Sequence, residues 1–405
     1  MHKTSQNKKS WVFAPLLAIM SLGVASAQPY AYVANGGPHT LGVLDTSTNT
    51  FTDTTITLSG APNSIAITPD GSRVYAALGT ANSVAVVSTA TSSVIATIPV
   101  GSNAVRAIMN ADGSQVYVMN QNSNSVSIID TGTNKVLSTL TVGSKPIGAA
   151  FSPDGTRAYV TNSYGASVSI INTSTRTVLG TFSTGGAYGS SGIVVLPNGN
   201  IYVANQFSNN VTVHNPSGSI IATLTGFSYP NWLAKTPDNS KIYVSNGNGN
   251  SISVINTANN ATLATIPVGS NPISVAVSAD GSTAFGVLSL ASELIEINTA
   301  NNTVSMIMPK VGPSPADVAM MPVSSGPPPP PPPTCTYSLS ATSANFGPAG
   351  GTGSVNVTTN SGCAWTAASN TGIASITSAL PRTIGNACDL PLLRSHVWPP
   401  SLLVA

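Results

Sequence analysis

A tetrapeptide close to Tyr-Val-x-Asn recurs along the chain at nearly constant spacing. Its seven copies begin at Tyr32, Tyr75, Tyr117, Tyr159, Tyr202, Tyr243 and Phe285. Successive copies are 43, 42, 42, 43, 41 and 42 residues apart. A period of this size indicates a repeat architecture, in which each unit buries its apolar surface against the next. The chain is therefore expected to form an array of similar units.

Each repeat contains four short stretches that are rich in β-branched and aromatic residues. In the fourth repeat these stretches are 158–161, 167–171, 177–182 and 191–196, with Asn, Gly, Ser and Thr between them. Short β-branched stretches bounded by turn residues predict strands. No apolar stretch has the period and length of a helix. Four short strands in about 42 residues predict one blade of a β-propeller.

The two ends of the array indicate how the ring closes. The first repeat has no strand-like stretch before its Tyr strand, and the stretch 315–321 has no Tyr strand after it. We therefore expect the C-terminal strand to complete the N-terminal blade. Residues 28–323 are predicted to form a closed, all-β propeller of seven blades. Closure is expected to remove the exposed sheet edges that invite aggregation.

The repeat motifs carry a family resemblance. The Tyr-Val-Thr-Asn at 159–162, the Ile-Pro-Val-Gly at 98–101 and the Pro-Asp-Gly at 153–155 resemble the YVTN family of β-propeller repeats. The resemblance covers about residues 30 to 322. It implies a seven-bladed propeller of secreted or cell-surface proteins, including surface-layer components, and implies no shared reaction. Leu78 and Leu288 replace the motif's Asn, so those two turns are expected to be built differently.

The N-terminus has the features of a secretory signal peptide. Three lysines precede an apolar segment at 11–24, which ends in Ala25-Ser26-Ala27. This order predicts cleavage after Ala27, with an uncleaved membrane anchor as the alternative. No later apolar run is long enough to span a membrane. Residues 1–27 are therefore interpreted as the signal, and the protein as secreted, cell-surface or periplasmic.

A second module is predicted beyond the propeller. Residues 324–334 contain seven consecutive prolines, which favour a stiff polyproline II linker, with a polyproline-binding partner as the alternative. Residues 335–378, with Cys-Thr-Tyr-Ser and Gly-Cys-Ala-Trp-Thr-Ala motifs, resemble part of a BACON-type immunoglobulin-like domain. The resemblance implies carbohydrate binding or a spacer role, here in an incomplete β-sandwich. Residues 379–405 lack strand alternation and are interpreted as a truncated or frameshifted tail.

The cysteines and the charge balance give further expectations. Cys335 and Cys363 are expected to pair in an exported protein, which leaves Cys388 over. The 14 basic and 12 acidic residues are close to balance and give no indication of nucleic-acid binding. Removal of the signal's three lysines leaves eleven basic and twelve acidic residues. The secreted chain is thus almost uncharged.

Catalytic and metal-binding patterns are scarce. Five aspartates recur at one equivalent turn, where they are expected to accept hydrogen bonds from the backbone, with metal binding as the alternative. They are Asp70, Asp112, Asp154, Asp238 and Asp280. His39 and His214 fall in different blades, without the spacing of a metal motif. No catalytic residue, metal site or cofactor is therefore predicted.

The most irregular sequence lies in the loops that enter the innermost strands and leave the second strands, all at one end of the channel. These loops are predicted to bring together seven candidate ligand-binding residues. They are Arg106, Lys145, Tyr164, Tyr188, Phe207, Tyr229 and Trp232. Aromatic rings beside amides and two cations suit a glycan or a peptide. The alternative is that the aromatics only cap the hydrophobic ring.

Three functions remain open from the sequence. The first is a non-enzymatic, monomeric binding scaffold whose partner is a glycan or a protein. The second is a lactonase-like propeller hydrolase or lyase at the channel mouth that uses Arg106, Lys145 or His214. The third is glycan binding by the C-terminal module alone.

Overall fold

The computed structural model describes residues 30–309 and 311–322 and six short strands beyond residue 336. The chain divides into two units, Met1–Gly326 and Pro327–Ala405. The predicted signal, the linker and all three cysteines lie outside the described residues. Within the described residues there is no helix, and therefore none that could cross a membrane.

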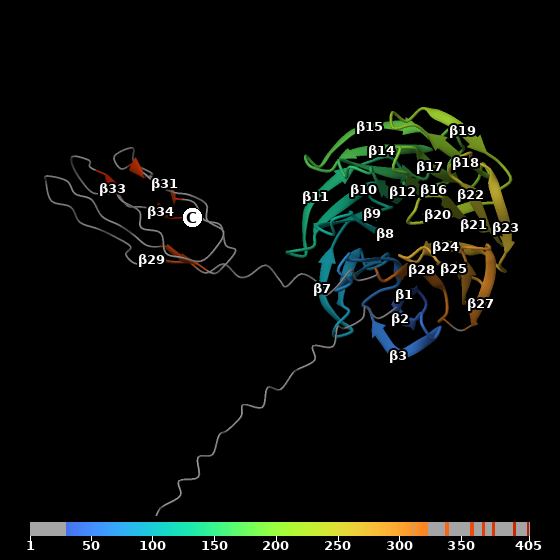
Figure 1. Ribbon diagram of the computed structural model, residues 1–405, viewed down its shortest axis with the longest axis horizontal. Coiled ribbons are helices and arrows are strands. Elements are labelled where there is room, and N and C mark those ends of the chain that lie inside the picture. The colour runs from blue at the N-terminus through green and yellow to red at the C-terminus, as the bar shows by residue number, and fades with distance from the viewer. Residues whose placement is uncertain are drawn as a thin grey trace, which may run out of the picture. The chain divides into compact units, whose positions relative to one another are not determined.

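The first unit is built from seven four-stranded antiparallel sheets, which we number as blades 1 to 7 (Figure 1). From the centre outward, blade 1 contains β28 (Pro315–Met320), β1 (Tyr30–Asn35), β2 (Thr40–Asp45) and β3 (Thr50–Thr57). Blade 2 contains β4 (Pro62–Ile67), β5 (Arg73–Leu78), β6 (Ser83–Ser88) and β7 (Ser93–Pro99). Blade 3 contains β8 (Ala104–Met109), β9 (Gln115–Asn120), β10 (Ser125–Asp130) and β11 (Lys135–Thr141).

The other four blades repeat this order. Blade 4 contains β12 (Pro146–Phe151), β13 (Arg157–Asn162), β14 (Ser167–Asn172) and β15 (Thr177–Ser183). Blade 5 contains β16 (Ser190–Val195), β17 (Ile201–Asn205), β18 (Asn210–His214) and β19 (Ile220–Leu224). Blade 6 contains β20 (Pro230–Lys235), β21 (Lys241–Asn246), β22 (Ser251–Asn256) and β23 (Thr262–Pro267). Blade 7 contains β24 (Pro272–Val277), β25 (Thr283–Leu288), β26 (Glu293–Asn298) and β27 (Thr303–Pro309).

The ring closes as the sequence predicts. Strand β28 pairs antiparallel with β1, with Val33 opposite Val318, so the last strand completes the first blade. The seven-bladed, all-β prediction is confirmed. The expectation that closure removes sheet edges is wrong, because the outermost strand of each blade still has a neighbour on one side only. Closure packs the faces of neighbouring sheets against each other, but leaves the outermost strands at the rim without a second neighbour.

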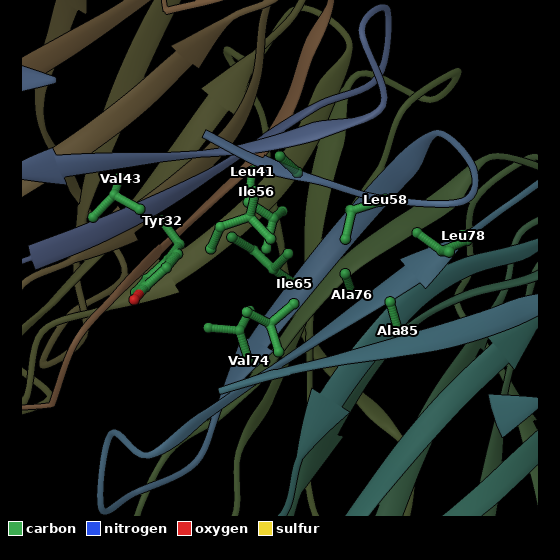
Figure 2. Close-up of a cluster of buried hydrophobic side chains, with 12 residues drawn as sticks. Tyr32, Leu41, Val43, Ile56, Leu58, Ile65, Val74, Ala76, Leu78 and Ala85 are labelled. Atoms are coloured by element: carbon green, nitrogen blue, oxygen red, sulfur yellow. The ribbon is translucent and has the colours of Figure 1, made fainter. Parts of the chain in front are cut away.

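The core lies between neighbouring blades. The second and third strands have both faces covered and are therefore almost continuously apolar, as in β5, where five of six residues are buried. Figure 2 shows one such layer, in which Tyr32 and Leu41 of blade 1 face Val74 and Leu78 of blade 2. Burying one such side chain stabilises the fold by about 1.5–3 kcal/mol. The same packing repeats at each blade junction and fixes the geometry of the channel.

The motif's Asn organises the end of the second strand. Asn162 Nδ2 donates to the hydroxyls of Ser167 and Ser169, at 3.1 and 2.9 Å, and so ties the turn to the third strand. In blades 2 and 7, Leu78 and Leu288 are fully buried in apolar clusters instead. The two turns therefore differ as expected, because an apolar contact replaces an amide–hydroxyl cluster.

The recurrent aspartates hold turns, as predicted. Asp238 accepts hydrogen bonds from the Thr236 hydroxyl, at 2.5 Å, and from the Ser240 backbone N–H, at 3.0 Å. The Thr236 hydroxyl first, and then Ser240, lower the pKa of the Asp238 carboxyl to about 2. At the other four turns, the aspartate accepts hydrogen bonds from hydroxyl and backbone N–H groups of neighbouring Ser and Thr residues. These carboxylates are committed to local structure.

The second unit contributes only short strand pairs to the described residues. Strand β29 (Tyr337–Leu339) pairs with β30 (Val357–Thr359), β31 (Ala367–Ala368) with β34 (Leu403–Val404), and β32 (Ser375–Ile376) with β33 (Leu392–Leu393). The tail after residue 378, which lacks strand alternation in its sequence, supplies β33 and β34, each of two residues.

Candidate functional site

Seven equivalent positions meet at the centre of the ring. Each is the third residue of an innermost strand, and in blade 5 this residue is Gly192. They are Asp317, Ser64, Arg106, Gly148, Gly192, Trp232 and Ser274, in the order of blades 1 to 7. Three of the seven, Asp317, Arg106 and Trp232, differ from the others in size or charge. The Arg106 side chain contacts both of the other two.

Arg106 is the centre of this group. Its Nη1 donates to Asp317 Oδ2 at 2.9 Å, and its Cζ lies 3.6 Å from the centroid of the Trp232 ring. The Arg106 and Asp317 side chains are only 12% and 6% exposed. One arginine of blade 3 thus bridges the carboxylate of blade 1 and an indole of blade 6. We call these three residues the channel triad.

Asp317 joins further blades to the triad. Its Oδ1 accepts from Ser274 Oγ of blade 7 at 2.6 Å, and its Oδ2 also accepts from the Ile65 backbone N–H of blade 2 at 3.3 Å. The carboxylate is therefore surrounded by donors. Among the described residues, the buried Nε of Arg106 has no hydrogen-bond partner. This N–H is therefore a buried donor without a partner among the described residues.

A second group of aromatic residues lies at the end of the channel where the innermost strands begin. The ring centroids of Tyr164 and Tyr188 are 6.0 Å apart, those of Tyr188 and Phe207 4.7 Å, and those of Phe207 and Tyr229 5.4 Å. The first three side chains are 65%, 55% and 48% exposed. We call this continuous row of four rings the aromatic ladder.

The loops of blades 4, 5 and 6 position the ladder. Tyr164 follows β13, Tyr188 precedes β16, Phe207 follows β17 and Tyr229 precedes β20. Gly189 has φ of 99°, and a Cβ on it would lie 2.3 Å from the Phe207 ring. Only glycine therefore allows Phe207 to pack beside Tyr188.

Two polar contacts support the ladder. The Tyr229 backbone N–H, in a left-handed conformation with φ of 55°, donates to Asn209 Oδ1 at 2.7 Å. Lys145 lies beside the blade 4 end, because its carbonyl accepts from the backbone N–H of Ser163, next to Tyr164, at 2.9 Å. Its Nζ donates to Asn122 Oδ1 at 2.7 Å. The ladder thus has one cation at one end.

The structure divides the seven predicted residues into two groups. Tyr164, Tyr188, Phe207 and Tyr229 form the ladder, with Lys145 beside it, while Arg106 and Trp232 belong to the channel triad. Sequence reasoning missed Asp317 as the partner of Arg106. The available signal was that Asp317 is a carboxylate outside the repeated turns, at the strand position equivalent to that of Arg106.

His214 lies away from the channel. It ends β18, the third strand of blade 5, where its Nδ1 pairs with the Gly218 carbonyl at 3.1 Å and its Nε2 with Thr212 Oγ1 at 3.0 Å. Its ring packs on Phe182, with centroids 5.0 Å apart. Burial lowers the pKa of this imidazole. The expectation that His214 could act at the channel mouth is wrong, since both of its ring nitrogens are hydrogen-bonded within blade 5.

At the opposite end from the ladder, a hollow of about 340 Å³ lies between blades 6 and 7. It is lined by Asp238, Asp280 and Lys241, among others. The lysine donates to the Thr299 carbonyl at 2.6 Å, and both carboxylates hold their turns. Over the described residues, no three His, Cys, Asp or Glu side chains come close enough to hold a metal ion. The hollow therefore has no free reactive group.

Comparisons with known proteins agree with the fold. The family described as "Lactonase, 7-bladed beta-propeller" matches residues 24–146, which include Arg106 but not Asp317 or Trp232. No curated protein matches the sequence. Among solved structures, Kuenenia stuttgartiensis hydrazine synthase is 19% identical, with a TM-score of 0.61, and the alignment covers 70% of this chain and 99% of that one.

Two other solved structures are similar to the same extent. A functionally unknown protein from Desulfotomaculum acetoxidans is 16% identical with a TM-score of 0.63, over 73% of this chain and 99% of its own. A candidate 6-phosphogluconolactonase from Bacteroides fragilis is 12% identical with a TM-score of 0.61, over 73% of this chain and 98% of its own. At these identities the likeness establishes the propeller fold alone.

Proposed function

We propose that the chain is an exported binding protein whose propeller captures a glycan or a protein on the aromatic ladder. The observation that supports this most directly is the exposure of the ladder. Three adjacent rings are 48–65% exposed in one continuous row, although single exposed aromatics are the norm on a monomer surface. Aromatic rings combine a large contact area with little loss of conformational entropy on binding. Such a row suits recognition.

The surroundings of the ladder favour a ligand without strong charge. Gln206, next to Phe207, donates through Nε2 to Asn231 Oδ1 at 2.6 Å, so amide groups lie beside the rings. Lys145 is the cation at the blade 4 end. Amides and tyrosine hydroxyls can exchange hydrogen bonds with sugar hydroxyls or with a peptide backbone. This chemistry fits both ligand classes of the proposal.

Export is part of the same proposal. The support is the signal-like sequence at residues 1–27, with Ala25 and Ala27 at the cleavage signature. The ladder then faces the periplasm, the cell surface or the medium, where glycans and surface proteins are found. N-terminal sequencing of the protein recovered from outside the cytoplasm should begin at Gln28. Retention of Met1 on a membrane-bound product would reject the cleavage.

The ladder is tested with matched variants of the secreted chain on a glycan and protein array. Tyr188→Ala with Phe207→Ala is expected to weaken capture at least tenfold and leave the melting temperature unchanged. Leu290→Ala is the control, because this side chain is 76% exposed in the β25–β26 turn at the same end of the ring but outside the ladder. Equal capture by the double variant and the control would reject the ladder as the binding surface.

A lactonase-like hydrolase is the second candidate function. It is supported by the match of residues 24–146 to a lactonase propeller family and by the unpaired Nε of Arg106 in the channel. This buried N–H could stabilise a developing oxyanion once side chains around it move to admit a substrate. The carboxylate of Asp317 would have to leave its donors to act as a base. Hydrolysis of a panel of lactones by the secreted chain, lost in Arg106→Met and kept in Tyr188→Ala, would favour this function over binding at the ladder.

A further inference from the structure

An aliphatic side chain is exposed at the same place on the outermost strand of five consecutive blades. These residues are Ile95, Leu137, Leu179, Ile221 and Leu263, each 42 residues after the last. Their side chains are 49%, 42%, 54%, 52% and 48% exposed. The hydrophobic core lies inward of them and does not require apolar residues here. We call this set the rim arc, and its strands lie along the outside of the ring in Figure 1.

A β-bulge places each of these residues. In blade 4, Ile170 pairs with Gly180 and Ile171 with Val178, so Leu179 has no partner on β14. The same shift leaves Ile95 and Leu263 unpaired in blades 2 and 6. A bulge on an edge strand ordinarily discourages pairing with another chain. Here each bulge presents a bulky apolar side chain outward instead.

The strands of the arc also lack the charges that usually protect a sheet edge. Strands β7, β15, β19 and β23 contain no charged residue, and β11 contains only Lys135. The prolines of these strands, Pro99 and Pro267, are the last residues of β7 and β23. Natural edge strands are commonly protected by lysine, other charges or proline within the strand. An apolar arc with unpaired backbone on uncharged strands is therefore a surface suited to association.

We propose that the rim arc is an interface between copies of this chain. An identical copy matches the arc in two ways. Its secreted form is almost uncharged, with eleven basic and twelve acidic residues after signal removal, so two copies do not repel each other strongly. C-terminal to each bulge, its outer strands keep a regular backbone that is complementary to itself when two edges meet antiparallel about a two-fold axis.

The curvature of the arc limits how much of it one copy can cover. Its five side chains face outward around a convex rim, so one contact between two discs covers only part of the arc. The rest remains available to further copies, which meet the same 42-residue spacing. Association therefore proceeds side by side, with the ends of the channel and the ladder left open. This proposed interface is an alternative to the monomer expected from the sequence, and it does not depend on the proposed ligand.

Sedimentation of the full secreted chain tests the proposal. The unaltered chain is expected to associate reversibly as its concentration rises. A variant with Ile95→Lys, Leu137→Lys, Leu179→Lys and Leu263→Lys is expected to raise the apparent dissociation constant at least tenfold. The matched control carries four lysines at exposed turn residues, Ala90→Lys, Ser174→Lys, Ala258→Lys and Ala300→Lys, and is expected to associate like the unaltered chain. A chain that stays monomeric, or an equal effect of both variants, overturns the proposal.

Hydrogen exchange of the unaltered chain tests the proposal without any substitution. Backbone amides of β7, β11, β15 and β19 are expected to become at least tenfold more protected from exchange as the protein concentration rises. The protection of the amides of the control turn residues, such as Ala90 and Ala258, is expected to stay the same. Protection of these strands that is independent of concentration would mean that the chain's own C-terminal unit covers the arc. Absence of protection at every concentration would mean that nothing covers it. Either result rejects the interface between copies.

Discussion

Arg106 Nη1 lies 2.9 Å from Asp317 Oδ2, although 211 residues separate the two in the sequence. Asp317 is on the strand that closes the ring, and Arg106 is on the innermost strand of blade 3. Two buried charges gain their full attraction only if the closing strand occupies the correct register. The pair therefore makes closure of the ring specific, in addition to the backbone ladder between β28 and β1.

Removing the carboxylate tests this relationship. Asp317→Ala leaves the guanidinium of Arg106 largely buried without its counter-charge, which is expected to lower the free energy of unfolding by about 3 kcal/mol. The double variant Arg106→Met with Asp317→Ala should recover most of this loss, because no unpaired charge remains. Urea unfolding measures both values. Equal losses in the single and double variants would show that the two charges are not coupled.

Trp232 is expected to behave differently from the ladder, although the sequence grouped them. Trp232→Ala removes a partly buried indole and its contact with the Arg106 guanidinium, so it should cost about 2 kcal/mol of stability. Tyr188→Ala removes a side chain that is 55% exposed and should cost less than about 1 kcal/mol. Thermal unfolding of the two variants measures the difference. The same melting temperature for both would contradict the division into triad and ladder.

Much of the fold could be predicted because the same pattern of strands and turns occurs in seven repeats. The anchor Asn, the turn aspartates and the incomplete first and last repeats each follow from local chemistry or from counting. The site was predictable only in part. Sequence spacing placed Tyr164, Tyr188 and Phe207 on one end of the ring, but which side chains meet inside the channel depends on contacts between blades. Arg106 was therefore separated from the ladder, and Asp317 was missed.

The rim shows a second limit of sequence reasoning. A strand-like stretch such as Thr177–Ser183 predicts a strand, but it does not reveal the bulge that exposes Leu179. The bulge arises where the twisted outer strand pairs with its neighbour, so it depends on the blade as a whole. The exposed aliphatic residue could be recognised only once the strands were paired.

The aspartate turns predict a loss of stability in acid. Hydrogen bonds from Thr236 and Ser240 lower the folded pKa of Asp238 to about 2, from an ordinary value of 3.8. Its contribution is therefore complete above pH 3.8 and is lost as the pH falls toward 2. Asp238→Asn should lower the melting temperature at pH 7, and its difference from the unaltered chain should shrink toward pH 2. A difference that is constant over this range would contradict the assignment.

His214 predicts a separate effect nearer neutral pH. Burial lowers the pKa of its imidazole from 6.5, so the folded blade binds fewer protons than the unfolded chain. Stability is then complete above pH 6.5 and declines as the pH falls below it. His214→Gln should be less stable at pH 7.5 but lose less stability between pH 7.5 and 5.5. The melting temperature over this interval measures the effect, and parallel curves for the two proteins would rule it out.

Blade 3 lacks a hydrogen bond that three other blades make. The hydroxyls of Tyr75 and Tyr243 donate to Asn134 Oδ1 and Asn302 Oδ1 of the next blade, at 2.7 and 2.8 Å. The Tyr202 hydroxyl donates to Asn260 Oδ1 in the same way. The corresponding residue for Tyr117 is Arg176. The Tyr117 hydroxyl is buried without a partner among the described residues, and burial raises its pKa to about 12.

Arg176→Asn is therefore expected to stabilise the propeller. Arg176 has φ of 53°, a left-handed conformation that Asn adopts more readily, and an Asn side chain there could accept from the Tyr117 hydroxyl. The two effects together should raise the free energy of unfolding by about 1–2 kcal/mol. Asn134→Arg is the reciprocal control and should destabilise the fold by a similar amount, because it leaves the Tyr75 hydroxyl without its acceptor. Denaturant unfolding of the two variants checks both signs. A destabilising Arg176→Asn would mean that the arginine makes a contribution at this turn that outweighs the missing hydrogen bond.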